Sequence, residues 1–205
     1  MNPYLGDLIR RMTTVEHVTH SDHSLSWNAH REAEKLTDLS HLEDLELLLS
    51  TSKSKEERKA AYFILGALGE NTSDARCAFV LAKQLGNEKD KYGLAVSLDA
   101  LAKIEKPRGF PLEAVYECLS DHRWLVRHAA IRALAKTCSV EVEDRLLKHL
   151  SLTNESHEII YCHATLGSVG SEKSLPALEL GLASRKRDVR DSAAFAIRTI
   201  KARIV

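Results

Sequence analysis

The sequence predicts an all-α fold, an α-α superhelix of about five to six antiparallel helix pairs stacked one on the next. Helix breakers are rare, with nine Gly and four Pro among 205 residues, whereas the helix formers Ala, Leu, Glu, Lys and Arg are abundant. A pattern of small and large apolar residues also recurs at a nearly constant spacing, which is the signature of a repeat protein. We therefore expect a solenoid rather than a single helical bundle.

The second helix of each pair is predicted from a small residue followed four positions later by Leu or Ile. A spacing of four places both residues on one face of a helix. The large residues, called anchors below, are 36, 33, 32 and 31 positions apart, and the residues 27–36 form a weaker earlier copy. The five pairs are Ala61/Leu65, Ser97/Leu101, Ala130/Leu134, Cys162/Leu166 and Ala193/Ile197.

The first helices are predicted between these copies, where apolar residues recur at i, i+3, i+4 and i+7. Gly69, Gly86 and Gly170 lie between the stripes, and we expect them to end helices by accepting a positive φ. A pair of this size cannot bury its own apolar stripe, so neighbouring pairs have to cover it. The predicted first helices cover residues 39–49, 74–85, 111–119, 142–150 and 174–182.

The stretches VRHAAIRAL and VRDSAAFAI resemble the second helix of HEAT repeats, in which an Asp precedes Val-Arg and spaced small residues follow. The copies at Leu94 and Ile159 depart from this pattern. The short period is most similar to the bilin-lyase-like subclass, and the resemblance covers residues 26–203. It implies the solenoid fold and is nearly silent on function. The matching residues are Asp121 with Val126 and Arg127, Asp188 with Val189 and Arg190, and Arg58 alone.

Domain organisation and location are predicted from composition. We expect an N-terminal helix and polar linker in residues 1–25 and the repeat domain in residues 26–205. Lys plus Arg equals Asp plus Glu at 29 each, which disfavours general nucleic-acid binding. The start lacks a signal-peptide pattern, no stretch approaches the ~20 apolar residues of a membrane span, and four dispersed cysteines suggest reduced core residues. A cytoplasmic protein is predicted.

Partner binding is predicted on the second helices, which line the concave face of HEAT-like stacks. Aromatic and Arg side chains are frequent in protein-binding hot spots. The alternative is that Phe63, Trp124 and Tyr161 pack between layers. Leu98, Ile131, Tyr161 and Thr165 are further outward positions in the expected register. The predicted binding residues are Lys59, Tyr62, Phe63, Asp99, Trp124, His128 and Arg132.

Two further segments carry candidate sites. His17, His20 and His23 have an H-x2-H-x2-H spacing, but they would diverge around a helix, so a solvated linker is the favoured interpretation and no metal site or cofactor is predicted. Residues 184–205 hold seven Lys or Arg against two Asp. They could form a patch for nucleic acid or an acidic partner, but a polar capping face of the last repeat is favoured.

The sequence predicts a non-catalytic scaffold, adaptor or stoichiometric inhibitor that binds a protein or peptide. It contains no GxSxG elbow, Gly-rich phosphate loop or HExxH. One alternative is a HEAT-like alkylpurine DNA glycosylase, which the chain resembles only in the stretch Trp124–Arg127 and whose Trp-Asp stretch with the catalytic carboxylate it lacks. Another is a bilin-lyase-like role, which the repeat subclass alone suggests and for which no chromophore pocket is identifiable.

Overall fold

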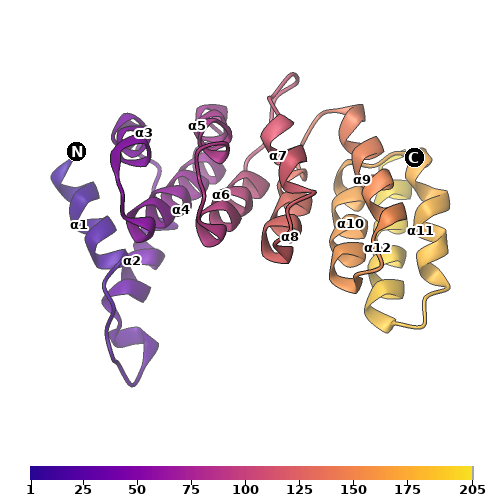
Figure 1. Cartoon of the computed structure of the whole chain (residues 1–205), viewed down its shortest axis with the longest axis horizontal. Coiled ribbons are helices and arrows are strands. Elements are labelled where there is room, and N and C mark those ends of the chain that lie inside the picture. The colour runs from indigo at the N-terminus through magenta and orange to yellow at the C-terminus, as the bar shows by residue number, and fades with distance from the viewer. Residues whose placement is uncertain (205) are drawn as a thin grey trace. The chain divides into compact units, whose positions relative to one another are not determined.

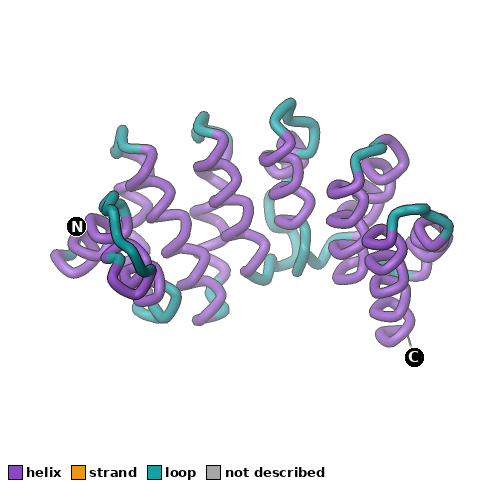
Figure 2. The backbone as a smooth tube through the Cα atoms, turned by 90° about the horizontal axis from the view of Figure 1, so that it is seen from below, coloured by secondary structure: helices purple, strands orange, loops and turns teal. Residues whose placement is uncertain are grey.

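The computed structural model describes residues 1–204, which form twelve α-helices, three short 3-10 helices and no strand (Figure 1). Figure 2 shows helices joined by short loops. The α-helices are α1 (Pro3–Met12), α2 (Leu25–Ala33), α3 (Leu42–Thr51), α4 (Lys55–Thr72), α5 (Ala75–Leu85), α6 (Lys91–Lys103), α7 (Glu113–Cys118), α8 (Trp124–Ala133), α9 (Val140–Leu152), α10 (Ser156–Val169), α11 (Leu175–Leu182) and α12 (Arg187–Ile204).

The chain forms two compact units, Met1–Glu105 with α1 to α6, and Lys106–Val205 with α7 to α12. Within the first unit, α3 packs on α4, α5 on α6, and the second helices α4 and α6 on each other. Within the second unit, α7, α9 and α11 pack on α8, α10 and α12, and α10 contacts both other second helices. The predicted all-α class of stacked helix pairs is therefore confirmed, whereas the predicted boundary at residue 26 stays a prediction.

The recurring small and large residues occupy the interior of the stack, as the repeat pattern predicts. All five small residues are fully buried, and so are the anchors apart from Ile197, which is almost completely buried. Second helices approach most closely where glycine follows an anchor. A Cβ on Gly66 would lie 2.8 Å from Cβ of Ala100, and a Cβ on Gly167 would lie 3.2 Å from Cα of Ala196. The same register therefore sets the helix spacing in both units.

The three glycines expected to end helices with a positive φ behave differently from the prediction. Helix α4 continues through Gly69 to Thr72 and ends at Ser73, which takes the left-handed φ of 56°. Gly86 and Gly170 have negative φ values of −66° and −72°. Gly69 is instead a packing residue, because a Cβ there would overlap Cδ1 of Ile104. Helices α5 and α10 thus end at Gly86 and Gly170 as predicted, but without a positive φ, whereas at Gly69 the prediction was wrong because the lack of a side chain serves close packing.

The arginine of the HEAT-like pattern forms hydrogen bonds to the loop that precedes its own helix in both units. Arg58 donates from Nη1 to the carbonyl of Ser52, Arg127 to that of Asp121, and Arg190 to that of Ser184, in each case six residues earlier. Arg58 also binds Glu88, 30 residues ahead, and Arg127 binds Glu158, 31 residues ahead. The arginine therefore ties its own turn to the next helix pair. This role accounts for the recurrence of the residue at one register.

Among the described residues, no helix combines the length and the apolar character that a membrane crossing requires. Cys77 and Cys162 are buried as small core residues, as expected, but Cys138 is exposed and Cys118 is intermediate. The expectation that all four cysteines are core residues was therefore wrong for Cys138, which lies in the loop between α8 and α9.

Candidate partner-binding faces

The second helices of the first unit carry an aromatic groove, called the α2–α4 groove below. It has a volume of about 610 Å³ and is framed by Trp27 and His30 on α2 and by Phe63 on α4. Trp27 is 43% exposed, and the guanidinium of Arg31 lies 4.4 Å from the centre of its ring. The remaining lining residues are Val18, Ser24, Ser26, Arg31 and Glu34.

Ring contacts hold the walls of the α2–α4 groove in place. The ring of His30 meets that of Phe63 edge to face with centroids 5.0 Å apart, and Nδ1 of His30 lies 2.7 Å from the carbonyl oxygen of Ser26. The Ser24 side chain accepts from the backbone N–H of Trp27 and so begins α2 beside the groove. The groove therefore presents aromatic surface in a fixed arrangement, which favours binding of an apolar side chain.

The exposure of the predicted binding residues depends on how many positions they precede an anchor. Phe63, Asp99 and Arg132, each two positions before an anchor, are half-buried at the surface of their units. Tyr62, three positions before its anchor, is only 1% exposed and its hydroxyl donates to Glu88 at 3.2 Å. The expected outward orientation of Tyr62 was therefore wrong, because one residue turns the side chain by about 100° around the helix.

The same rotation around the helix accounts for the burial of Leu98 and Ile131. Thr165, one position before its anchor, is a third residue that was expected to point outward. Leu98 and Ile131, also three positions before an anchor, are fully buried. Thr165 is buried and its hydroxyl donates to the carbonyl of Ile131 at 3.1 Å. Lys59 is half-buried and forms an ion pair with Glu56 one turn earlier. Of the predicted residues on α4, Lys59 and Phe63 thus remain accessible and Tyr62 does not.

In the second unit, aromatic and cationic side chains form a row across α8 and α10, called the α8–α10 face below. Trp124 is 61% exposed and its ring centroid lies 5.2 Å from that of His128. The His128 ring lies at the same distance from Tyr161, and the guanidinium of Arg132 lies 4.7 Å from the centre of the Tyr161 ring. His128, predicted as an outward residue, is buried at 6% exposure between the two aromatic rings.

Beneath the α8–α10 face lies a cluster of one imidazole and two carboxylates. Ligand atoms of His128, Glu155 and Glu158 all lie within 4.8 Å of one another. Burial acts to raise the pKa of Glu158, but the Thr153 hydroxyl and the Arg127 guanidinium outweigh it and lower this pKa. For Glu155, the backbone N–H of Glu158 and the side chain of His157 likewise outweigh burial and lower the pKa to about 2.

The sequence analysis missed this cluster. His128 and the pair Glu155 and Glu158 lie on successive second helices, about one repeat apart in the sequence. The signal that could have found them is the repeat register itself, which places the start of α10 beside the middle of α8. No local spacing links the three residues, so a motif search along one helix does not detect them.

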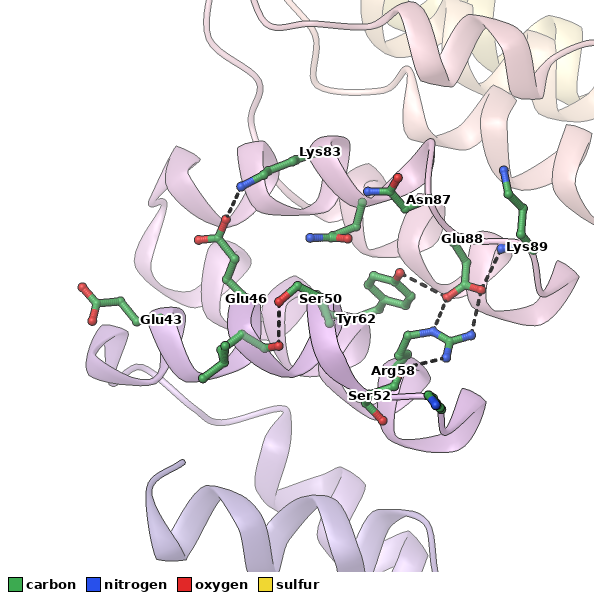
Figure 3. A pocket seen from close by; sticks show the side chains of 14 residues that line it. Glu43, Glu46, Ser50, Ser52, Arg58, Tyr62, Lys83, Asn87, Glu88 and Lys89 are labelled. Carbon is green, nitrogen blue, oxygen red and sulfur yellow. Dashed lines mark hydrogen bonds and ion pairs between the residues drawn. The ribbon is translucent and has the colours of Figure 1, made fainter.

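A second groove lies among α3, α4 and α5 and has a volume of about 850 Å³ (Figure 3). Its central charges are already paired. Lys83 binds Glu46 at 2.8 Å, and Arg58 binds Glu88 through Nε at 2.8 Å and Nη2 at 3.0 Å. Burial acts to raise the pKa of Glu88, but Arg58 and two backbone N–H groups lower it to about 2. The arrangement is that of a structural ion pair between helix pairs.

The other predicted candidates lie apart from these faces. His17, His20 and His23 are exposed, and only the rings of His20 and His23 approach each other, at 6.0 Å. In the basic C-terminal segment, Arg203 donates to the carbonyls of Gly167, Ser168 and Gly170. That contact satisfies carbonyls at the end of α10. The interpretation of this segment as a polar capping face of the last repeat stays a prediction.

Comparison with known proteins supports the repeat assignment. Residues 112–198, which lie in the second unit, match the family model of HEAT repeats. The chain is also similar to the crystal structure of an engineered protein from the Northeast Structural Genomics Consortium, with a TM-score of 0.53, 22% identity and coverage of 98% of both chains. This likeness concerns the fold alone. No curated protein matches the sequence. The chain is thus an all-α repeat protein whose residues 112–198 are similar to HEAT repeats, and the bilin-lyase-like subclass stays a prediction.

Proposed function

We propose that the chain is a non-catalytic interaction module that binds a protein or peptide partner on its second helices. The α2–α4 groove is the observation that carries this proposal. It combines an exposed Trp27, the Phe63 ring and Arg31 stacked on the indole. Aromatic and Arg side chains contribute a large share of binding energy in protein interfaces.

The chemistry of the groove defines the kind of partner that it fits. Its walls are aromatic, and Arg31 and Glu34 stand beside them as an exposed ion pair at 2.7 Å. An apolar or aromatic side chain of a partner would enter between Trp27 and Phe63, and polar groups of its backbone would meet the charged rim. This division into an apolar centre and a polar rim is typical of protein interfaces.

The α8–α10 face supports the same function from the second unit. Trp124 is 61% exposed, and the guanidinium of Arg132 lies over the Tyr161 ring at 4.7 Å from its centre. A pre-ordered aromatic and Arg surface loses little side-chain entropy on binding. We therefore assign Trp124 and Arg132 to a binding face of the second unit and Lys59, Phe63 and Asp99 to a binding face of the first unit, and we withdraw the buried Tyr62 and His128.

The DNA glycosylase alternative gains no support from the stretch Trp124–Arg127. The Arg127 side chain is occupied by Glu158 at 2.7 Å and by the carbonyls of Asp121 and His122. It serves the stack rather than an accessible surface. A bilin-lyase-like role likewise has no specific observation in its favour.

The test uses the partner recovered from the natural source and the full-length chain. In a titration of partner affinity, we expect Trp27→Ala combined with Phe63→Ala to weaken binding at least about tenfold, in line with hot-spot losses above 1 kcal/mol. Leu47→Ala is the matched control, because Leu47 is an exposed apolar residue on α3 that lines the other groove. Equal affinities for the double variant and the wild type would refute the proposal, as would a larger loss in the control.

A further inference from the structure

The imidazole of His128 has an unusual environment. Its Nε2 atom is buried and makes no hydrogen bond, although it lies 3.3 Å from Oε2 of Glu155. An unsatisfied buried polar atom destabilises the folded chain, so a protein normally provides it with a partner. This nitrogen lies beside the Glu155 carboxylate, and a ligand atom of Glu158 belongs to the same cluster, which suggests what that partner is.

Two packed helices bring the ligand atoms together. His128 lies in the middle of α8, Glu155 is the residue that caps α10, and Glu158 lies in the first turn of α10. Helices α8 and α10 pack side by side in the second unit (Figure 1). The cluster therefore rests on two regular elements and not on a flexible loop.

Outer hydrogen bonds orient both carboxylates. Glu158 accepts from Nε of Arg127 at 2.7 Å and from the hydroxyl of Thr153 at 2.7 Å, and His149 lies 3.1 Å from it. Glu155 accepts from the backbone N–H of Glu158 at 2.8 Å. Metal-binding side chains commonly have such partners, which fix the orientation of the ligand atoms.

We propose that His128, Glu155 and Glu158 bind a divalent first-row transition ion of the Zn²⁺ class. The ligand set consists of one imidazole nitrogen and carboxylate oxygens, which suits Zn²⁺ and its neighbours, whereas Mg²⁺ and Ca²⁺ prefer oxygen ligands alone. Two carboxylates balance the charge of the ion. The inference goes beyond partner binding and does not depend on it.

Binding requires a small contraction of the cluster. Zn²⁺ lies about 2.0–2.2 Å from nitrogen and oxygen ligands, so in its tetrahedral geometry two ligand atoms on one ion lie about 3.3–3.6 Å apart. The ligand atoms lie within 4.8 Å of one another, so the cluster has to contract, and Glu155 is the member with room to move because its side chain is 42% exposed. His157, whose Nδ1 lies 3.1 Å from Oε1 of Glu155, stands beside the open side of the cluster. It is positioned to become a fourth ligand.

The test is a calorimetric titration of Zn²⁺ into untagged full-length protein that has been freed of metal with a chelator. We expect one ion per chain, and we expect Glu155→Gln and His128→Ala each to weaken binding at least tenfold. Glu155→Gln keeps the proposal testable if His128→Ala fails to fold, since Glu155 is partly exposed. Circular dichroism verifies folding of both.

The control variant replaces His17, His20 and His23 together by Asn and should bind Zn²⁺ as the wild type does. Co²⁺ in place of Zn²⁺ should give a visible spectrum without a sulfur-to-metal charge-transfer band, because no cysteine is a ligand. Absence of stoichiometric binding, unchanged affinity in Glu155→Gln, loss of binding in the His17/His20/His23 control, or a thiolate band would each overturn the inference. Partner affinity measured in the presence of chelator tests the proposed function without bound metal. Either proposal can therefore fail while the other holds.

Discussion

At the scale of single residues, the ion pair between Arg58 and Glu88 shows how one side chain joins neighbouring helix pairs. The Glu88 carboxylate is almost fully buried and accepts from Arg58, from the Tyr62 hydroxyl and from the backbone N–H groups of Lys89 and Asp90. These donors satisfy the charge that burial would otherwise penalise. The residue is therefore expected to stabilise the first unit only while it is ionised.

The pH dependence of stability tests this role. The pKa of Glu88 falls from its usual 4.5 to about 2 in the folded chain. A depressed carboxyl pKa contributes stability above the unfolded value, and this contribution is lost as the pH falls from about 5 toward 2. The shift corresponds to a free energy of unfolding on the order of 3 kcal/mol at neutral pH.

We expect Glu88→Gln to unfold at lower urea concentration than the wild type at pH 7, by a free-energy difference of about 2–3 kcal/mol, and this difference should shrink below pH 5. Glu46→Gln is the control, since its pair with Lys83 is exposed and worth at most about 1 kcal/mol. A difference between Glu88→Gln and the wild type that stays constant from pH 7 to pH 3 would contradict the assignment.

At the scale of helices, the glycine after an anchor sets how closely second helices pack. Gly66 on α4 has Cβ of Ala100 within 2.8 Å and Cα of Ala100 within 3.0 Å of the place where its own Cβ would lie. Backbone atoms of α6 therefore stand in the way of any side chain. We expect Gly66→Val to lower the free energy of unfolding by about 1–3 kcal/mol, as overpacking generally does.

Gly86→Ala is the matched control for Gly66→Val. No atom lies within 4 Å of a Cβ at Gly86, and its φ of −66° suits any residue. We expect a change within about 0.5 kcal/mol, or a slight gain through a less flexible unfolded chain. Denaturant unfolding followed by circular dichroism compares the two variants. A loss in Gly86→Ala as large as that in Gly66→Val would show that close packing is not the cause.

The helices were predictable from the sequence and the exact exposure of their residues was not. The small/large pairs located each second helix because burial and helical periodicity act on the same positions, as at Ala130 and Leu134. The register of the outer face was only half correct, since Phe63 and Tyr62 are neighbours about 100° apart around α4, so an error of one residue exchanges the buried and the accessible side chain. The α2–α4 groove was missed because it depends on how α2 packs against α4, which no local pattern specifies.

At the scale of the whole molecule, the chain consists of two compact units. In each unit, a glycine on one second helix packs against an alanine on the next. Gly66 with Ala100 serves the first unit and Gly167 with Ala196 serves the second. In repeat proteins, stability is approximately a sum of terms from each repeat and its nearest neighbours. A defect in one unit is therefore expected to act mainly on that unit.

Hydrogen exchange measured by mass spectrometry tests this expectation. We predict that Gly66→Val accelerates amide exchange mainly in α4 and α6, and that Gly167→Val does so mainly in α10 and α12, by about tenfold for each 1.4 kcal/mol lost. Each variant serves as the control for the other. Equal acceleration in all helices by both variants would mean that the chain opens as a single cooperative unit.

The α2–α4 groove is the place where the proposed function can be tested most directly. A photo-crosslinking amino acid incorporated at position 27 in the natural host should join the chain to its partner, and the same residue at position 47, in the groove of α3 and α5, should not. A crosslinked product that forms at position 27 and disappears with Phe63→Ala is the result that the account predicts. Crosslinking of the same partner at position 47 but not at position 27 would contradict it.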